Sequence, residues 1–188
     1  MTEPSLPEKV VAIDRRLSEV RIPHAFGGAL ALAYYAEPRA TVDVDVNVFV
    51  STARVDEVSD ALSPLGVSAL PSEDERAALE REGQCRTWWG RTPVDLFFSY
   101  GEVHEAMREG VRRVPFGEDE LQILGPEHLV VCKACFDRPK DWLDIEQVLV
   151  STDPFEAREA QRWLHRLLGE GDQRKRRFDR LVAELTDR

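Results

Sequence analysis

Residues 41–50, Thr-Val-Asp-Val-Asp-Val-Asn-Val-Phe-Val, alternate polar and apolar side chains and constrain the fold more than any other segment. Alternation of this kind, with valine at most of the apolar positions, predicts a β-strand. Successive side chains of a strand point to opposite faces, so the polar groups would share one face and the valines the other. The polar face would carry Thr41, Asp43, Asp45 and Asn47, and the apolar face would carry Val42, Val44, Val46 and Val48.

The rest of the chain mixes helical and extended patterns up to about residue 124 and is helical beyond it. The expected helices cover residues 7–20, 29–36, 53–65, 72–82, 103–110, 126–136, 139–149, 154–168 and 173–185. The other expected strands cover 21–26, 111–116 and 121–124, with a hairpin of 85–89 and 94–99 that turns at 90–93. We therefore expect an α/β (α+β) fold. A mixed sheet flanked by helices, residues 1–124, would carry a helical part, residues 125–188, packed on it as one structural unit.

The charge balance counts against a protein that binds nucleic acid through a generally basic surface. The 188 residues carry 25 Lys and Arg against 35 Asp and Glu, a formal net charge of −10. Positive charge is concentrated only in segment 174–180, where Arg177 or Phe178 could stack on an RNA base. We favour a solvated helix face there, because charge runs of this kind are commonly solvated.

Cysteine content and hydropathy indicate a cytoplasmic protein with no membrane partner. Three cysteines do not make a disulfide framework, which favours a reducing compartment. The first nine residues lack the basic start and apolar stretch of a signal peptide. The longest apolar run, residues 25–36, is shorter than the roughly 20 residues that span a bilayer.

Asp43 and Asp45 are the first candidate functional residues along the central strand. Two carboxylates at positions i and i+2 on one strand face repel each other, and a cation between them removes that cost. All-oxygen ligands suit Mg²⁺, so the pair predicts a magnesium site. A strand face that is merely polar and faces solvent would show the same pattern without any function.

Two further features strengthen the prediction. Gly27 and Gly28 lie between an extended segment and a helix, where backbone N–H groups can hold phosphate oxygens, although a tight turn alone would also explain them. Asp95 lies among apolar residues on a neighbouring strand, where a carboxylate is costly unless it is paired or bound to a cation. An edge strand facing solvent is the alternative for Asp95. Two metal ions bridged by such acids are the usual device for in-line displacement at phosphorus, so the set predicts nucleotidyl transfer.

The motifs resemble those of the minimal nucleotidyltransferases of the polymerase β superfamily, most closely the AbiEii-type, toxin-related branch. Gly27-Gly28 followed by Arg39-Ala-Thr-Val-Asp-Val-Asp45 is similar to the family signature. A second block is similar to the segment after the palm domain: Lys133, then Arg138-Pro-Lys-Asp-Trp-Leu-Asp144. Gly28 departs from the serine that many relatives have there. The resemblance implies a nucleotidyltransferase-type sheet with a helical C-terminal subdomain.

The resemblance also implies roles for these residues. Asp43, Asp45 and Asp95 would be the catalytic residues and the ligands of two Mg²⁺ ions, with an NTP such as ATP as co-substrate. The residues implied in binding the nucleotide and its phosphates are Gly27, Gly28, Arg39, Thr41, Lys133 and Asp141. Thr41 is expected to orient Arg39 or a neighbouring loop, and Asp141 to lie on a helix that supports the site.

The predicted activity is transfer of NMP from an NTP to an acceptor hydroxyl. AbiEii-type relatives imply a tRNA or other RNA acceptor in a toxin–antitoxin setting, with a possible antitoxin protein as partner. Two alternatives stay open: transfer to a small molecule such as an aminoglycoside or lincosamide antibiotic, and a non-catalytic module that keeps the fold to bind a partner.

Two other groups of residues favour structural roles. His128, Cys132 and Cys135 share one helix face, but no second Cys/His pair completes a zinc site. Trp88 and Trp89 must point opposite ways in a strand, so core packing explains at least one of them.

Overall fold

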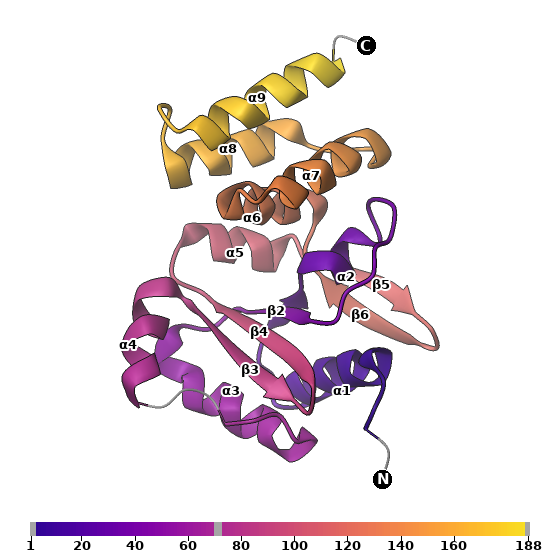
Figure 1. The fold of residues 1–188 in the computed structure, drawn as a ribbon, viewed down its shortest axis with the longest axis vertical. Coiled ribbons are helices and arrows are strands. Elements are labelled where there is room, and N and C mark those ends of the chain that lie inside the picture. The colour runs from indigo at the N-terminus through magenta and orange to yellow at the C-terminus, as the bar shows by residue number, and fades with distance from the viewer. Residues whose placement is uncertain (1–2, 70–72, 187–188) are drawn as a thin grey trace. The chain divides into compact units, whose positions relative to one another are not determined.

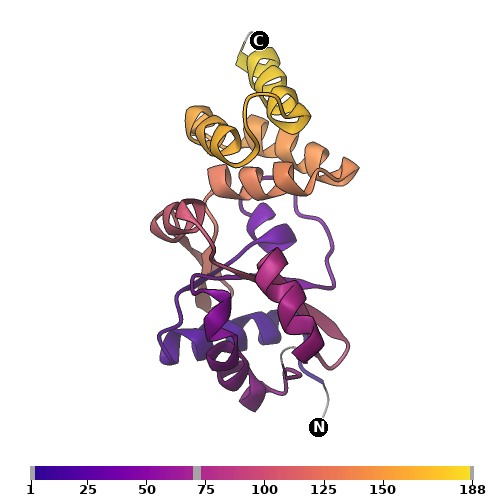
Figure 2. The same cartoon turned by 90° about the vertical axis from the view of Figure 1, so that its left-hand side faces the viewer.

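The computed structural model describes residues 3–69 and 73–186 and divides into two compact units (Figures 1 and 2). The first comprises Met1–Leu30 and Ala40–Leu124, and the second comprises Ala31–Arg39 and Gly125–Arg188. Residues 31–39 thus group with the helical C-terminal part. That the two units form one structural body stays a prediction.

The first unit is built on a six-stranded mixed sheet with the strand order β3-β4-β2-β1-β6-β5. The strands are β1 (His24–Phe26), β2 (Val44–Val48), β3 (Gln84–Trp89), β4 (Thr92–Phe98), β5 (Arg112–Phe116) and β6 (Asp119–Ile123). β2 pairs in parallel with β4, and β1 pairs in parallel with β6; the remaining neighbours are antiparallel. This arrangement confirms the predicted mixed α/β class.

Helices flank the sheet within the first unit and make up most of the second. The first unit holds α1 (Leu6–Glu19), α3 (Val55–Leu62) between the 3₁₀ turns η1 (Thr52–Arg54) and η2 (Ser63–Leu65), α4 (Glu73–Glu82) and α5 (Glu102–Glu109). The short α2 (Gly28–Leu32) leads from the first unit into the second. The second unit holds α6 (Pro126–Phe136), α7 (Pro139–Ser151), α8 (Ala157–Leu168) and α9 (Gln173–Thr186), with α6 in contact with the other three. Within the described ranges, no helix combines the length and apolar character needed to cross a membrane.

The central strand is shorter than the sequence pattern predicts. Val42 is 76% exposed and so does not belong to the apolar face, whereas the three valines of β2 are buried. Thr41 and Asp43 lie in the segment that precedes the strand. Alternation therefore predicted the face of each residue inside β2 correctly but placed the start of the strand too early.

Three helix boundaries also differ from prediction. The helix expected at 29–36 ends at Leu32 and continues as turns, in which the amide of Tyr35 donates to the carbonyl of Leu32 at 2.9 Å. The helix expected from residue 154 begins at Ala157. The helix expected at 53–65 breaks into α3 and two 3₁₀ turns, the second with a proline in its first turn. Residue 72, the expected start of the fourth helix, lies outside the described residues.

A buried lysine ties α1 to the β3–β4 hairpin. The side chain of Lys9 is 2% exposed, and its ammonium donates to Glu3 Oε1 at 2.6 Å, to the carbonyl of Trp89 at 2.8 Å and to Thr92 Oγ1 at 2.9 Å. The hydrogen bond from Lys9 is the largest cause that lowers the pKa of Glu3 to about 2. All three donor positions of the ammonium are thereby satisfied, as burial of a charge requires.

We predict that Lys9→Met lowers the free energy of unfolding by about 1–3 kcal/mol, because the buried carbonyl of Trp89 loses its donor. Urea denaturation measures the change. Lys140→Met removes an exposed lysine and serves as the control, with an expected change within about 0.5 kcal/mol. Equal effects of the two substitutions would contradict the proposed role of Lys9.

Candidate active site

Two carboxylates meet where β2 and β4 pair. Asp45 lies directly opposite Asp95 in this parallel ladder, so both side chains project from the same face of the sheet. The apolar neighbours of both aspartates along the two strands are buried: Val44, Val46, Val94 and Leu96. Burial of these neighbours on one face of the sheet leaves the aspartates on the other.

The Gly-Gly turn packs against Asp45. The amide of Gly27 donates to the carbonyl of Asp45 at 2.9 Å, and Gly28 has a positive φ of 52°. A Cβ atom on Gly28 would lie 1.7 Å from Asp45 Oδ2, and one on Gly27 would lie 2.9 Å from the side-chain nitrogen of Asn47. Only glycine therefore lets the turn lie this close to the carboxylate.

Asp43 lies one residue before β2, and the hydroxyl of Thr41 donates to its carboxylate. Thr41 was expected to orient Arg39 or a neighbouring loop, and the hydrogen bond assigns it to Asp43 instead. The hydroxyl thus fixes the orientation of a carboxylate that the strand itself does not hold.

Asp95 is paired with an arginine that the sequence analysis missed. Arg86 lies opposite Asp95 in the β3–β4 ladder and forms a bidentate ion pair, with Nε to Oδ1 and Nη2 to Oδ2 both at 2.7 Å. This pairing raises the pKa of Arg86 well above its ordinary value, and the charges of Asp43 and Asp45 add to the effect. β4 lies between β3 and β2, so Asp95 is on an interior strand and not on an edge strand.

The donor set fits a hard cation by its chemistry, because three carboxylates supply the oxygen ligands that Mg²⁺ prefers. In the structure, however, the three carboxylates are not arranged as a metal site. Within residues 3–69 and 73–186, no group of three His, Cys, Asp or Glu side chains is arranged to hold a metal ion. Both oxygens of Asp95 are instead engaged by Arg86. Binding of two magnesium ions stays a prediction.

The other predicted phosphate-binding residues, Arg39, Lys133 and Asp141, lie in the second unit and form a network of charges with Asp144. The buried ammonium of Lys133 lies 2.6 Å from Asp144 Oδ2 and 3.9 Å from Asp141 Oδ1. Arg39 Nη2 donates to the same Asp144 oxygen at 3.2 Å, and Arg138 Nε donates to Asp141 Oδ2 at 2.6 Å. Their role in phosphate binding stays a prediction, whereas their mutual pairing stabilises this unit.

Solved structures match the chain over most of its length, although no protein-family model matches the sequence and no curated protein matches it significantly. The solution structure of the antibiotic-resistance factor ANT(2'')-Ia matches with a TM-score of 0.62 at 13% identity, covering 100% of both chains. An antigenic nucleotidyltransferase-like protein from Paracoccidioides brasiliensis matches with a TM-score of 0.57 at 15% identity, covering 95% of this chain and 92% of its own. The lincosamide antibiotic adenylyltransferase LnuA, bound to lincomycin, matches with a TM-score of 0.54 at 10% identity, covering 80% of this chain and 100% of its own.

The chain has the fold of the nucleotidyltransferases. This agrees with the fold that the sequence motifs implied. At identities of 10–15% the likeness concerns the fold alone, so the AbiEii-type branch stays a prediction.

The paired tryptophans and part of the basic segment 174–180 have structural roles in this nucleotidyltransferase fold. Trp89 is buried and Trp88 is 46% exposed, which confirms that the two rings point opposite ways. Phe178 is fully buried in the second unit, so its proposed stacking on an RNA base is wrong. Arg177 stacks on the ring of Trp142 at 4.2 Å, and Lys175 pairs with Asp179 at 2.7 Å, so part of the basic segment is used inside the fold.

The helix face with His128, Cys132 and Cys135 is partly buried: His128 is buried and the two cysteines are of intermediate exposure. Burial lowers the pKa of His128, which favours the neutral ring. Within the described ranges, these three residues do not belong to any group of His, Cys, Asp or Glu side chains arranged to hold a metal ion.

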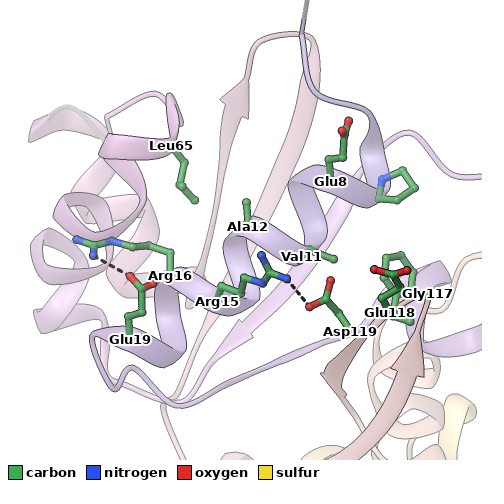
Figure 3. A pocket seen from close by; sticks show the side chains of 12 residues that line it. Glu8, Val11, Ala12, Arg15, Arg16, Glu19, Leu65, Gly117, Glu118 and Asp119 are labelled. Atoms are coloured by element: carbon green, nitrogen blue, oxygen red, sulfur yellow. Dashed lines mark hydrogen bonds and ion pairs between the residues drawn. The ribbon is translucent and has the colours of Figure 1, made fainter.

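An open depression of about 760 Å³ lies beside α1 and the β5–β6 turn (Figure 3). Its arginines are already paired: Arg15 Nη2 lies 2.5 Å from Asp119 Oδ1, and Arg16 Nη1 lies 3.3 Å from Glu19 Oε2. It shares no residue with the three aspartates. The aspartate cluster and the Gly-Gly turn are therefore the better candidate site.

We predict that Gly28→Ala destabilises the protein by at least about 1 kcal/mol more than Gly117→Ala, measured by urea denaturation. Both glycines have a positive φ, which costs an alanine about 1–2 kcal/mol, but Gly117 has nothing within 4 Å of an added Cβ. The difference between the two variants therefore isolates the clash with Asp45. Equal losses would show that the carboxylate moves away freely.

We also predict that Asp144→Asn lowers the free energy of unfolding by about 3 kcal/mol, because it leaves the buried Lys133 without its nearest anion. Glu146→Gln, an exposed position on the same helix, is the matched control and should change stability by less than about 0.5 kcal/mol. Thermal or urea denaturation compares the two. A loss as small as that of the control would rule out the network as a stabilising element.

Proposed function

We propose that this protein is a Mg²⁺-dependent nucleotidyltransferase that transfers NMP from an NTP to the hydroxyl group of an acceptor. One observation carries the proposal: Asp45 and Asp95 lie opposite each other on β2 and β4, with Asp43 one residue before β2 and the Gly-Gly turn against Asp45. The nucleotidyltransferase fold supports it.

Asp43, Asp45 and Asp95 would hold the metal. Gly28 would present its backbone N–H to phosphate oxygens, whereas the N–H of Gly27 already donates to the carbonyl of Asp45 and fixes the turn. Magnesium bound there would offset the negative charge of the triphosphate and of the three carboxylates. The acceptor oxygen forms a bond to the α-phosphorus while the bond from that phosphorus to the bridging oxygen of pyrophosphate breaks. Asp95 accepts the hydroxyl proton, and pyrophosphate leaves with the electron pair of the broken bond.

A small cationic molecule is the first acceptor class to test. The net charge of −10 and the carboxylate cluster would attract a polycation such as an amino sugar. ANT(2'')-Ia has been crystallised with adenylyl-2''-tobramycin, and this structure matches the chain with a TM-score of 0.55 at 14% identity, covering 96% of this chain and 97% of its own.

RNA is the second candidate acceptor, as the AbiEii-type resemblance implies, with an antitoxin as the associated partner. The observation that favours it is the basic helix α9, where Arg176 and Arg180 are exposed. The internal pairing of Arg174 with Asp172 and of Lys175 with Asp179 reduces the charge available for phosphate. The small-molecule acceptor is therefore placed first.

Incubation with Mg²⁺ and each α-labelled NTP, with aminoglycosides, lincosamides and total tRNA offered in turn, tests the proposal. We expect label on one acceptor class, and a loss on the order of 10²–10⁴-fold in Asp45→Asn and Asp95→Asn. Asp60→Asn, an exposed aspartate on α3, should keep full activity. Chelation by EDTA should abolish labelling. Absence of Asp45-dependent label on every acceptor, with no NTP binding, would refute the proposal.

A further inference from the structure

The ion pair between Arg86 and Asp95 occupies the third carboxylate of the candidate site. The guanidinium donates to both oxygens of Asp95 at 2.7 Å, so both oxygens already accept a charge-assisted hydrogen bond. Arg86 comes from β3, the last strand at one edge of the sheet (Figure 1). Its side chain is 53% exposed, whereas that of Asp95 is 17% exposed. The arginine therefore has room to swing into solvent, and the aspartate does not.

The pair also places a positive charge beside the carboxylates. Asp45 and Asp95 lie opposite each other and Asp43 lies one residue before β2, so a positive charge nearby reduces the repulsion among their carboxylates. Arg86 supplies one, and its interaction extends to Asp43 and Asp45 as well as Asp95. Among the described residues, no three His, Cys, Asp or Glu side chains are arranged to hold a metal ion.

We propose that Arg86 is a positioning residue that acts as a built-in counter-ion: it holds Asp95 until a divalent cation binds, and the cation and Arg86 compete for that carboxylate. The inference rests on the proposed metal-dependent function. Competition means that metal binding must first break two charge-assisted hydrogen bonds. A half-exposed ion pair costs little to open, so the device lowers metal affinity without preventing binding.

Titration of the full chain with Mn²⁺ alone, followed by the electron paramagnetic resonance signal of the free ion, measures the competition without any NTP or acceptor. We expect Arg86→Gln to lower the Kd for Mn²⁺ by about threefold to tenfold. Arg113→Gln makes the same charge change on β5, at the opposite edge of the same sheet, and should leave the Kd unchanged. Urea denaturation of each variant reports whether it is folded.

Arg86→Lys separates direct competition from general electrostatics. Lysine keeps the charge but cannot form the two-pronged contact, so a competing bidentate pair predicts that this variant also binds Mn²⁺ more tightly than the wild type. A Kd equal to that of the wild type in Arg86→Lys, with tighter binding only in Arg86→Gln, would overturn the competition. A weaker or unchanged affinity in Arg86→Gln would overturn it as well.

The wild type and Asp45→Asn distinguish failure of this inference from failure of the proposed function. Mn²⁺ binding that depends on Asp45 but is insensitive to Arg86 would leave the metal site intact and refute the counter-ion. Absence of Asp45-dependent binding in both the wild type and Arg86→Gln would refute both. Binding that is detected only after Arg86 is replaced, and that Asp45→Asn removes, would support both.

Discussion

The parallel pairing of β2 with β4 is the interaction on which the candidate site depends. Its register sets Val46 against Leu96 and Val44 against Val94, and all four side chains are buried. Because side chains alternate along a strand, a register that buries these residues must bring Asp45 opposite Asp95 on the other face. A slip of one residue would bury a carboxylate and expose an apolar side chain. The hydrophobic core therefore enforces the approach of two like charges that would otherwise separate.

A different structural feature accommodates each of the three carboxylates, and the three features come from different parts of the first unit. Thr41 donates a hydroxyl to Asp43, Arg86 donates a guanidinium fork to Asp95, and the absence of a side chain on Gly28 makes room for Asp45. These features orient the acids, but one guanidinium does not neutralise three carboxylates. Under the proposed function, a divalent cation would add to this charge compensation, because oxygen ligands of this kind suit Mg²⁺.

The strands and the three acids could be predicted from the sequence, but the contacts that orient the acids could not. Alternation predicts which side of β2 each residue faces because burial enforces a period of two. It does not predict where the strand begins, since Val42 has the right residue type and yet is exposed. Arg86 was missed because the hairpin was expected to turn through four residues, 90–93. That turn would place Trp88 opposite Asp95. The observed two-residue turn pairs Trp89 with Thr92 and so brings Arg86 opposite Asp95. A change of two residues in one turn thus replaces an aromatic neighbour of the third carboxylate by a cation.

In the second unit a buried cation is compensated by carboxylates, whereas in the first unit carboxylates are compensated by a cation. Asp141 and Asp144 are three residues apart on α7 and so share a helix face, and both carboxylates lie within 4 Å of the buried ammonium of Lys133 on α6. Burial of a lysine requires such anions, so these motif residues would be retained for folding even if they had no other task. Arg39 and Arg138 join the same network, which brings three cations to two carboxylates. Arg138 precedes the first turn of α7 and pairs there with Asp141, so this arginine also contributes to the start of the helix. Within this network, Arg39 and Lys133 both contact the same oxygen of Asp144, so a phosphate group bound by either side chain would have to compete with that carboxylate.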